Sequence, residues 1–295
     1  MTKKHTKFGR TLEKESRLWN VWRKFRKNKL AMVGMTILIF LLLVAVFADV
    51  IADYDTQVIY QNRRQRLVEP CAQFWFGTDA LGRDVLARVV HGSRLSLSIA
   101  FAATTASTLL GGTLGALTGY YGGRIDNIIM RLIDIVMSIP SMLLSIAIVA
   151  ALGSDIRNLL IAMTLGQVPR FTRVVRSLVI TAAADDYVEA AKVCGASNAR
   201  IIIRHILPNI VGPVIVQATM SVASIILTTA GLSFIGLGVQ PPAPEWGTML
   251  SESRDCMQTD PYLVIAPGVA IALAVFSLNT IGDGLRDALD PRSGD

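Results

Sequence analysis

The chain has 295 residues, of which 52% are hydrophobic and only 17% are charged, and its mean hydropathy is +0.48. This composition excludes a pair of ordinary soluble domains and indicates a polytopic membrane protein. Three cysteines, without a Cys/His cluster at metal-ligand spacing, exclude a disulfide framework and a zinc module. The net charge of +7 lies mostly in short stretches between apolar runs, and no nucleic-acid motif accompanies it.

The first uncharged run, Leu30 to Ala48, predicts a transmembrane helix. It has 19 residues, which at about 1.5 Å per residue approaches the ~30 Å thickness of the hydrocarbon layer. A long basic segment precedes the run, and no clean small-residue cleavage site follows it. We therefore expect a retained helix and not a cleaved signal peptide.

Five further uncharged runs raise the expected number of spans to six. They cover residues 95–123, 135–154, 158–169, 206–244 and 261–282. The fifth run of the six is too long for one helix, and glycines and prolines crowd its second half. We expect a helix from about Pro208 to Ala230 and then an irregular segment buried in protein or lining a cavity, because unpaired backbone is not tolerated against lipid.

The fourth run is too short to span a membrane by itself. It reaches membrane length only if it extends to about Ile180, with Arg170, Arg173 and Arg176 snorkelling to one interface. A re-entrant or interfacial helix is the alternative interpretation of this segment.

The distribution of basic residues predicts the orientation of the chain. Twenty-one of the 29 Lys and Arg residues lie in the N-terminal segment, the second-to-third loop, the fourth-to-fifth loop and the tail. This bias places both termini in the cytoplasm. The cations just before the first span are expected to meet anionic lipid at ~1 kcal/mol each; they are Arg23, Lys24, Arg26, Lys27 and Lys29.

On this topology Cys71 and Cys256 fall on the outer face and Cys194 falls inside. An outer disulfide and two unrelated thiols both remain possible interpretations.

Two features within the spans have a spacing that suggests contacts. Gly111, Gly115 and Gly119 are four residues apart, so they form one stripe that lets another helix approach closely, in this chain or in a partner. Arg131 and Asp134 are three apart and predict an ion pair near the interface, with ion translocation through Asp134 as the alternative. A proton-coupled transporter would usually carry more ionisable groups inside its spans.

The loop between the fourth and fifth spans has the signals of two short helices. Asp186 can cap the first helix with Glu189 in a capping-box position, and Gly195 suits a left-handed stop. A second helix is expected from near Ser197 to Pro208. On the first helix Tyr187, Ala190, Ala191 and Cys194 share a face with little side-chain bulk. This face suits either the close docking of a partner or a helix lying on the membrane surface.

The order of residues in this loop resembles a known motif. Glu189-Ala190-Ala191, three residues, Gly195, and then a helix ending at Leu207-Pro208 look like the EAA loop of ABC importer permeases, by which that family docks onto its cytoplasmic ATPase. His205 departs from the broader consensus, which has Ile there.

Three further groups of residues resemble the C-type permease subunit of dipeptide and oligopeptide (peptide/nickel) ABC importers. They are Gly77-Thr78-Asp79 with Gly82-Arg83-Asp84, Gln240-Pro241-Pro242 with Glu245-Trp246-Gly247, and Gly282-Asp283-Gly284-Leu285-Arg286-Asp287 with Leu289-Asp290-Pro291. The likeness runs from about Trp19 to Arg292.

The resemblance implies an all-α polytopic membrane protein with six transmembrane helices, the type I ABC importer permease fold and both termini cytoplasmic, in the bacterial inner membrane. It divides the chain into a basic segment (1–29), a first helix with its outer loop (30–92), a five-helix permease core (93–283) with a coupling loop (185–208), and a cytoplasmic tail (284–295).

The resemblance also implies which residues act. The coupling-loop residues are Asp186, Tyr187, Glu189, Ala190, Ala191, Gly195, Ala196, Leu207 and Pro208. The outer residues, expected to face the vestibule or a binding protein, are Gly77, Thr78, Asp79, Gly82, Arg83, Asp84, Glu245, Trp246 and Gly247. Loop architecture that needs no ligand is the alternative interpretation of these segments.

The expected partners are a second permease subunit, two ABC ATPases, an extracytoplasmic solute-binding protein and membrane lipid, with no nucleic acid. No cofactor or metal is expected on this chain. Gly-Lys never occurs, so the chain lacks a phosphate loop and ATP with Mg²⁺ belongs to the partner ATPases.

The expected function is that of a transport subunit without enzymatic activity, which forms half of the translocation path for di- or oligopeptides. Glutathione or a nickel chelate is the alternative substrate. A stand-alone secondary transporter or channel is the alternative class of protein. It predicts internal inverted repeats and ionisable residues at the midplane, of which only Asp134 is a candidate here.

Overall fold

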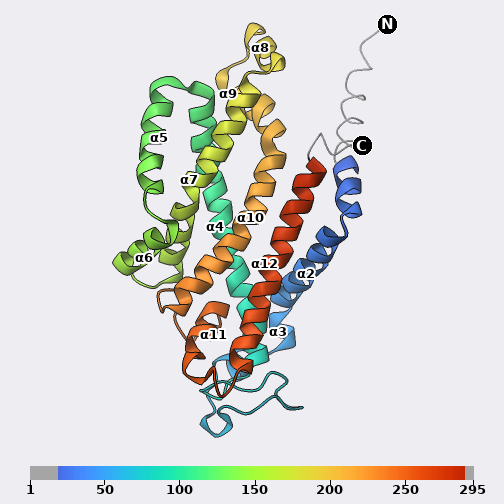
Figure 1. Cartoon of the computed structure of the whole chain (residues 1–295), viewed down its shortest axis with the longest axis vertical. Coiled ribbons are helices and arrows are strands. Elements are labelled where there is room, and N and C mark those ends of the chain that lie inside the picture. Colours follow the sequence, from blue (N-terminus) through green and yellow to red (C-terminus); the bar gives the residue numbers. More distant parts are fainter. Residues whose placement is uncertain (1–18, 290–295) are drawn as a thin grey trace.

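The computed structural model describes residues 19–289, and helices form all of its regular elements. The labelled α-helices are α2 (Lys29–Val46), α3 (Ala48–Ile51), α4 (Val85–Tyr121), α5 (Gly123–Met137), α6 (Ser141–Leu152), α7 (Ile156–Ala183), α8 (Asp186–Val193), α9 (Asn198–Ile201), α10 (Leu207–Phe234), α11 (Trp246–Glu252) and α12 (Tyr262–Leu289). Short π- or 3-10 helices cover Tyr54–Ile59, Arg63–Gln65, Ile202–Ile206 and Arg254–Cys256. Residues 19–27 are also helical. Figure 1 shows the long helices side by side, with α8 at one end of the bundle and α3 and α11 at the other.

Four helical segments in the described chain are long and apolar enough to cross a membrane. They are α2, α4, the continuous run Asn198–Phe234 and α12, and the bent pair of α5 and α6 would make a fifth. Helix α7 is also long enough, but it carries several arginines in its second half. Length and composition therefore give four or five spans, and the expected sixth stays a prediction.

Two expected spans have different boundaries in the structure. Helix α4 begins at Val85 and not near Leu95, because the Asp84 carboxylate caps it by accepting hydrogen bonds from the first-turn amides of Leu86 and Ala87 at 2.8 and 3.3 Å. The helix expected over 135–154 is broken, with α5 and α6 bent by 84° on either side of Pro140. Proline disfavours helical backbone in the residue before it, which explains the break.

The sequence predicted that the helix beginning near Ser197 would end at Pro208, but in the structure the chain stays helical through this residue. Residues Ile202–Ile206 form a wide π-type turn, and α10 follows directly with Pro208 in its first turn. A proline is tolerated there because the first-turn amides of a helix have no acceptor within the helix. Helix α10 then continues to Phe234, four residues past the expected end at Ala230, before the irregular segment begins.

The glycine stripe of α4 packs against α7 of the same chain. A Cβ added to Gly111 would lie 2.6 Å from the Phe171 Cβ, and one added to Gly115 would lie 2.6 Å from the Thr172 carbonyl oxygen. Phe171 and Thr172 are completely buried. The stripe is thus a packing device within the chain, and α7 is a continuous interior helix rather than a helix lying on the surface.

We expect Gly115→Ala to destabilise the bundle by about 1–3 kcal/mol, because the new methyl group has no room against α7. Gly112 is the matched control, since it lies on the same helix and a Cβ there would meet nothing within 4 Å. Gly112→Ala should be neutral or slightly stabilising, because alanine favours helices over glycine. Thermal unfolding in detergent measures both. Equal losses in the two variants would contradict a packing role for the stripe.

Ion pairs join α5 to α7, and they differ from the expected pair. Arg176 donates to both carboxylate oxygens of Asp126 at 2.5 and 2.6 Å, and Arg173 donates to Asp134 at 2.6 Å. The predicted Arg131–Asp134 pair is wrong: Arg131 is exposed, and Asp134 reaches across to the neighbouring helix. These pairs also mean that Arg173 and Arg176 do not extend freely to an interface.

The three cysteines are free thiols. Cys71 and Cys256 therefore form no outer disulfide.

Candidate functional site

Helix α8 projects from one end of the bundle, beside the ends of α9 and α10 (Figure 1). It spans Asp186–Val193, and Asp185 rather than Asp186 occupies the N-cap position. No side-chain hydrogen bond caps this end, so the capping box expected from Asp186 and Glu189 is absent. The start of α8 is held by backbone contacts instead, with the Val188 amide donating to the Asp185 carbonyl at 2.9 Å.

The expected left-handed stop at Gly195 is present. Its φ is +77°, a conformation that glycine adopts without steric cost. The Gly195 amide donates to the Lys192 carbonyl at 2.9 Å, and the Ala196 amide donates to the Ala191 carbonyl at 3.0 Å. This pair of bonds is the Schellman arrangement, which satisfies the last carbonyls of α8 and fixes the direction in which the chain leaves it.

One side of α8 is anchored to the bundle. Val188 is completely buried, and Ala191 and Ala196 are half-buried, in an apolar cluster with residues of α4, α7 and α9 that include Val179 and Ile201. The prediction that Ala191 belongs to the bare docking face is therefore wrong. It lies on the inner side of the helix because it follows Val188 at three-residue spacing.

The other side of α8, which we call its open face, consists of Glu189, Ala190 and Val193. Val193 is 84% exposed. Cys194 is exposed at the same end, and Tyr187 lies at the edge with 37% exposure. The open face has little bulk near Ala190, and the Glu189 side chain makes no hydrogen bond with any other described residue.

Polar contacts tie the loop after α8 to the end of α4. The Tyr120 hydroxyl donates to the Asn198 side-chain oxygen at 2.9 Å, and the Lys192 ammonium lies 5.7 Å from the centre of the Tyr120 ring. Leu207 is half-buried against the same apolar cluster, and Pro208 is exposed. A force applied to α8 would thus reach both α4 and α10.

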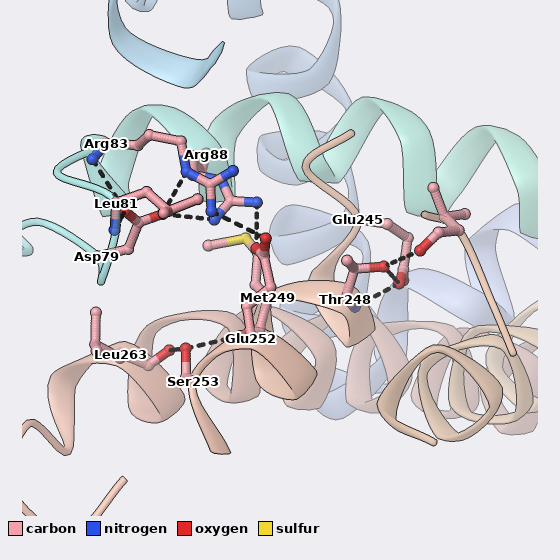
Figure 2. A network of polar contacts seen from close by, with 11 residues as sticks. Asp79, Leu81, Arg83, Arg88, Glu245, Thr248, Met249, Glu252, Ser253 and Leu263 are labelled. Atoms are coloured by element: carbon pink, nitrogen blue, oxygen red, sulfur yellow. Dashed lines mark hydrogen bonds and ion pairs between the residues drawn. The ribbon is translucent and has the colours of Figure 1, made fainter. Parts of the chain in front are cut away.

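A buried network of ion pairs involves α11, at the opposite end of the bundle from α8 (Figure 1), and Figure 2 shows its side chains. Asp79 accepts hydrogen bonds from the Arg83 Nε at 2.6 Å and from an Arg88 guanidinium nitrogen at 2.7 Å. The same two arginines donate to the two carboxylate oxygens of Glu252, at 3.0 and 2.7 Å. This outer network of Asp79, Arg83, Arg88 and Glu252 joins the segment before α4 to α11.

The charges in the outer network balance one another. Burial by itself raises the pKa of the Asp79 carboxyl. The neighbouring Arg88 and Arg83 charges and two backbone hydrogen bonds together lower this pKa by more than burial raises it, so it lies below its usual 3.8. Both arginines are buried, with side chains 2% exposed. Buried charges of this kind persist only when they are paired and hydrogen-bonded.

Glu245 and Trp246 fasten α11 to α4 beside this network. Trp246 is completely buried, and its indole N–H donates to the Val89 carbonyl at 3.0 Å. Glu245 is 1% exposed and accepts hydrogen bonds from the Ser96 hydroxyl and from the Thr248 amide, which caps α11.

The nine outer residues singled out in the sequence therefore build the fold at this end. All except the half-buried Asp84 are buried: Gly77, Thr78, Asp79, Gly82, Arg83, Glu245, Trp246 and Gly247. Gly82 shows the constraint, since its φ is +79° and an added Cβ would lie 2.0 Å from the Asn62 carbonyl oxygen. None of the buried side chains is open to a solute, in contrast to the vestibule-facing role expected of them.

Sequence reasoning missed Arg88, Glu252 and Ser96. Arg88 could have been noticed, because the N-cap signal of Asp84 places it in the first turn of α4, close to the outer motif residues. Glu252 and Ser96 carry none, because their partners lie far away in the sequence.

These observations define an integral membrane protein built as a helical bundle, with an exposed short helix at one end and a buried network of ion pairs at the other. The chain matches the family model for the binding-protein-dependent transport system inner membrane component over residues 111–294. It also matches the model for the N-terminal transmembrane domain of oligopeptide transport permease C over residues 16–70. The chain belongs to the family of binding-protein-dependent transport system inner membrane components, which are permeases of ABC importers.

Individual relatives agree with this family over nearly the whole chain. The dipeptide transport system permease protein DppC of Alkalihalophilus pseudofirmus is 48% identical, covering 92% of this chain and 88% of its own. The di/tripeptide transport system permease protein DppC of Pseudomonas aeruginosa is 44% identical, covering 94% and 93%. The glutathione transport system permease protein GsiD of Escherichia coli is 43% identical, covering 92% and 89%.

A solved structure supports the fold. A chain of the MetNI methionine ABC transporter in inward-facing conformations aligns with a TM-score of 0.58 at 17% identity, covering 70% of this chain and 98% of that chain. The fold is thus that of an ABC importer permease.

Proposed function

We propose that this chain forms half of a heterodimeric path through the bacterial inner membrane for di- or oligopeptides. A second permease supplies the other half, and an extracytoplasmic binding protein delivers the substrate. Two separate ABC ATPases bind and hydrolyse ATP with Mg²⁺, and this chain contributes no cofactor. The names of the relatives support the substrate class, since dipeptides, tripeptides and glutathione all contain peptide bonds.

The observation that carries the coupling role is the two-sided construction of α8. Its inner side is anchored by Val188 and its end is fixed by Gly195, while the open face presents Ala190 and Val193 to solvent. A rigid helix with a small apolar surface suits docking into a groove of a partner. The acidic residues around that face (Asp185, Asp186 and Glu189) disfavour the alternative of a helix on an anionic membrane surface.

The proposed topology has six spans, with both termini and α8 in the cytoplasm. Helix α7 is the sixth span: it packs along α4 over the glycine stripe, and Asp126 and Asp134 neutralise two of its arginines. Pairing of this kind lowers the cost of placing charges within a membrane. The ends of the described chain lie at the same end of the bundle as α8 (Figure 1).

The division of the chain follows the same scheme. We propose a permease core over 93–283 with the coupling loop 185–208, preceded by the basic segment 1–29 and the first helix with its outer loop (30–92), and followed by the tail 284–295. The matches to separate family models over 16–70 and 111–294 support an N-terminal addition to a common core.

Val193→Glu tests the docking role. We expect the tagged chain, purified in mild detergent, to lose at least about tenfold of its co-purifying ATPase, because an unpaired charge would be buried in the docked interface. The second permease should be retained. Tyr60→Glu is the control, since Tyr60 is 63% exposed at the opposite end and receives the same new charge.

Two results would contradict the proposal. ATPase that stays bound to Val193→Glu, with normal transport, would overturn the docking assignment for the open face. Recovery of the unaltered chain without any second permease or ATPase, under conditions that preserve other membrane complexes, would overturn the importer assembly itself.

A further inference from the structure

Residues 19–27 form a helical segment whose inner side is fixed against the bundle. Phe25 is 1% exposed and belongs to an apolar cluster with Ala31, Ile281 and Ala288, against which Val21 also packs. A Cβ on Gly284 of α12 would approach the Phe25 ring to 3.1 Å, so the ring lies directly on that helix. This contact determines which side of the segment faces outward.

The outward side combines aromatic and basic residues. Trp19, Trp22, Arg23, Arg26 and Lys27 line a cavity of about 310 Å³. Their three- and four-residue spacing puts them on one helical face, opposite Val21 and Phe25. The Trp22 ring stacks on Phe25, with centroids 5.9 Å apart and an interplanar angle of 15°. The Trp22 side of the cavity therefore packs against the buried cluster through Phe25.

The basic groups that line this cavity have no ion-pair or hydrogen-bond partner within the described part of the chain. Trp19 is 66% exposed and Trp22 is 41% exposed. Arg23, Arg26 and Lys27 are exposed and form no ion pair or hydrogen bond with another described residue. Three neighbouring cations repel one another, and exposed indole rings favour a surface that is apolar on one side and wet on the other.

We propose that this cavity, the aromatic-basic site, binds the phosphate headgroup of an anionic phospholipid such as phosphatidylglycerol. The cations complement the phosphate, and the indole rings suit the headgroup level, where tryptophan is enriched. Helix α2 begins at Lys29 and exposes Leu30 and Val33, which supply apolar surface for acyl chains directly after the site. The site goes beyond transport: it fixes the end of the first span at one membrane face.

The experiment is native mass spectrometry of the full chain in detergent, titrated with phosphatidylglycerol or phosphatidylcholine. We expect phosphatidylglycerol to bind about tenfold more tightly, and excess inorganic phosphate to leave it bound. Arg23→Gln with Arg26→Gln should remove this preference. Trp22→Leu should weaken binding of both lipids.

The matched control is Arg63→Gln with Arg64→Gln, which removes the same charge from exposed residues of the outer loop. It should leave the preference for phosphatidylglycerol unchanged. Equal loss in the control and in the site variant would show an effect of net charge alone and overturn the site. Equal binding of the two lipids by the unaltered chain, or displacement by inorganic phosphate, would overturn it as well. Neither readout depends on transport, so these failures are distinct from failure of the importer proposal.

Discussion

Gly195→Val is expected to abolish substrate-stimulated ATP hydrolysis and transport by the assembled importer while the chain still inserts into the membrane. Gly195 has a φ of +77°, and a β-branched residue is strongly disfavoured there. Such strain costs about 1–3 kcal/mol locally. The chain would relieve it by breaking the two hydrogen bonds that end α8, and the open face would then lose its fixed direction. Proteoliposomes with the full complex provide both measurements.

The structure supplies a matched control for this strain. Gly236 has a φ of +82°, and a Cβ there would meet nothing within 4 Å, as at Gly195. It lies after α10, at the other end of the bundle from α8. Gly236→Val should therefore lower stability to a similar extent but leave the ATPase bound. If both variants uncouple the ATPase equally, backbone strain rather than the position of α8 is responsible.

Asparagine distinguishes conformation from the absence of a side chain at residue 195. Asn tolerates the left-handed region better than other residues with a side chain. Gly195→Asn should keep most of the transport activity, since Gly195 is exposed and a Cβ there would meet nothing within 4 Å. Loss of activity as complete as in Gly195→Val would mean that a partner contacts this backbone directly.

The local features of the fold could be predicted because their signals are local. Uncharged runs indicated α2, α10 and α12, the four-residue spacing of Gly111, Gly115 and Gly119 indicated close helix packing, and Gly195 indicated the end of α8. Each of these depends on a few consecutive residues and on the period of a helix.

The orientation of α8 could not be predicted because both of its sides carry apolar residues. Val188 and Val193 are five residues apart and lie on opposite sides, and only the contact with the cluster around Val179 decides which is buried. Burial of Val188 also fixes the orientation of the two alanines: Ala191 lies on the inner side of α8 and Ala190 on the outer side.

The polar partners could not be predicted because they lie far apart in the sequence. Arg88 and Glu252 are separated by 164 residues, and Asp134 pairs with Arg173 at a separation of 39 instead of with its neighbour Arg131. Short-range spacing suggests only the pairs that one helix can make. Tertiary packing replaced such a pair at Asp134 and buried most of the outer motif residues that were expected to face the vestibule or a binding protein.

Asp79→Asn is expected to lower the free energy of unfolding by about 3–5 kcal/mol, since it removes one charge from a buried set and leaves Arg83 and Arg88 with Glu252 alone. Glu69→Gln is the control, because Glu69 is exposed in the same outer loop. Its effect should stay within about 0.5 kcal/mol. Thermal unfolding of the purified chain in detergent compares the two. Similar small losses would mean that the outer network contributes little to stability.

The acid sensitivity of the same variant tests the charge of Asp79 directly. Although burial raises the pKa of its carboxyl, the two arginines hold it below the usual 3.8, so the folded state favours the ionised form. The stabilisation is therefore fully present above the unfolded pKa of 3.8 and is lost as the pH falls from there through the lower folded value. The unaltered chain should lose stability in this window more steeply than Asp79→Asn, which has no proton to bind at this position. Parallel pH profiles would show that Asp79 is not the group whose charge holds the segment before α4 against α11.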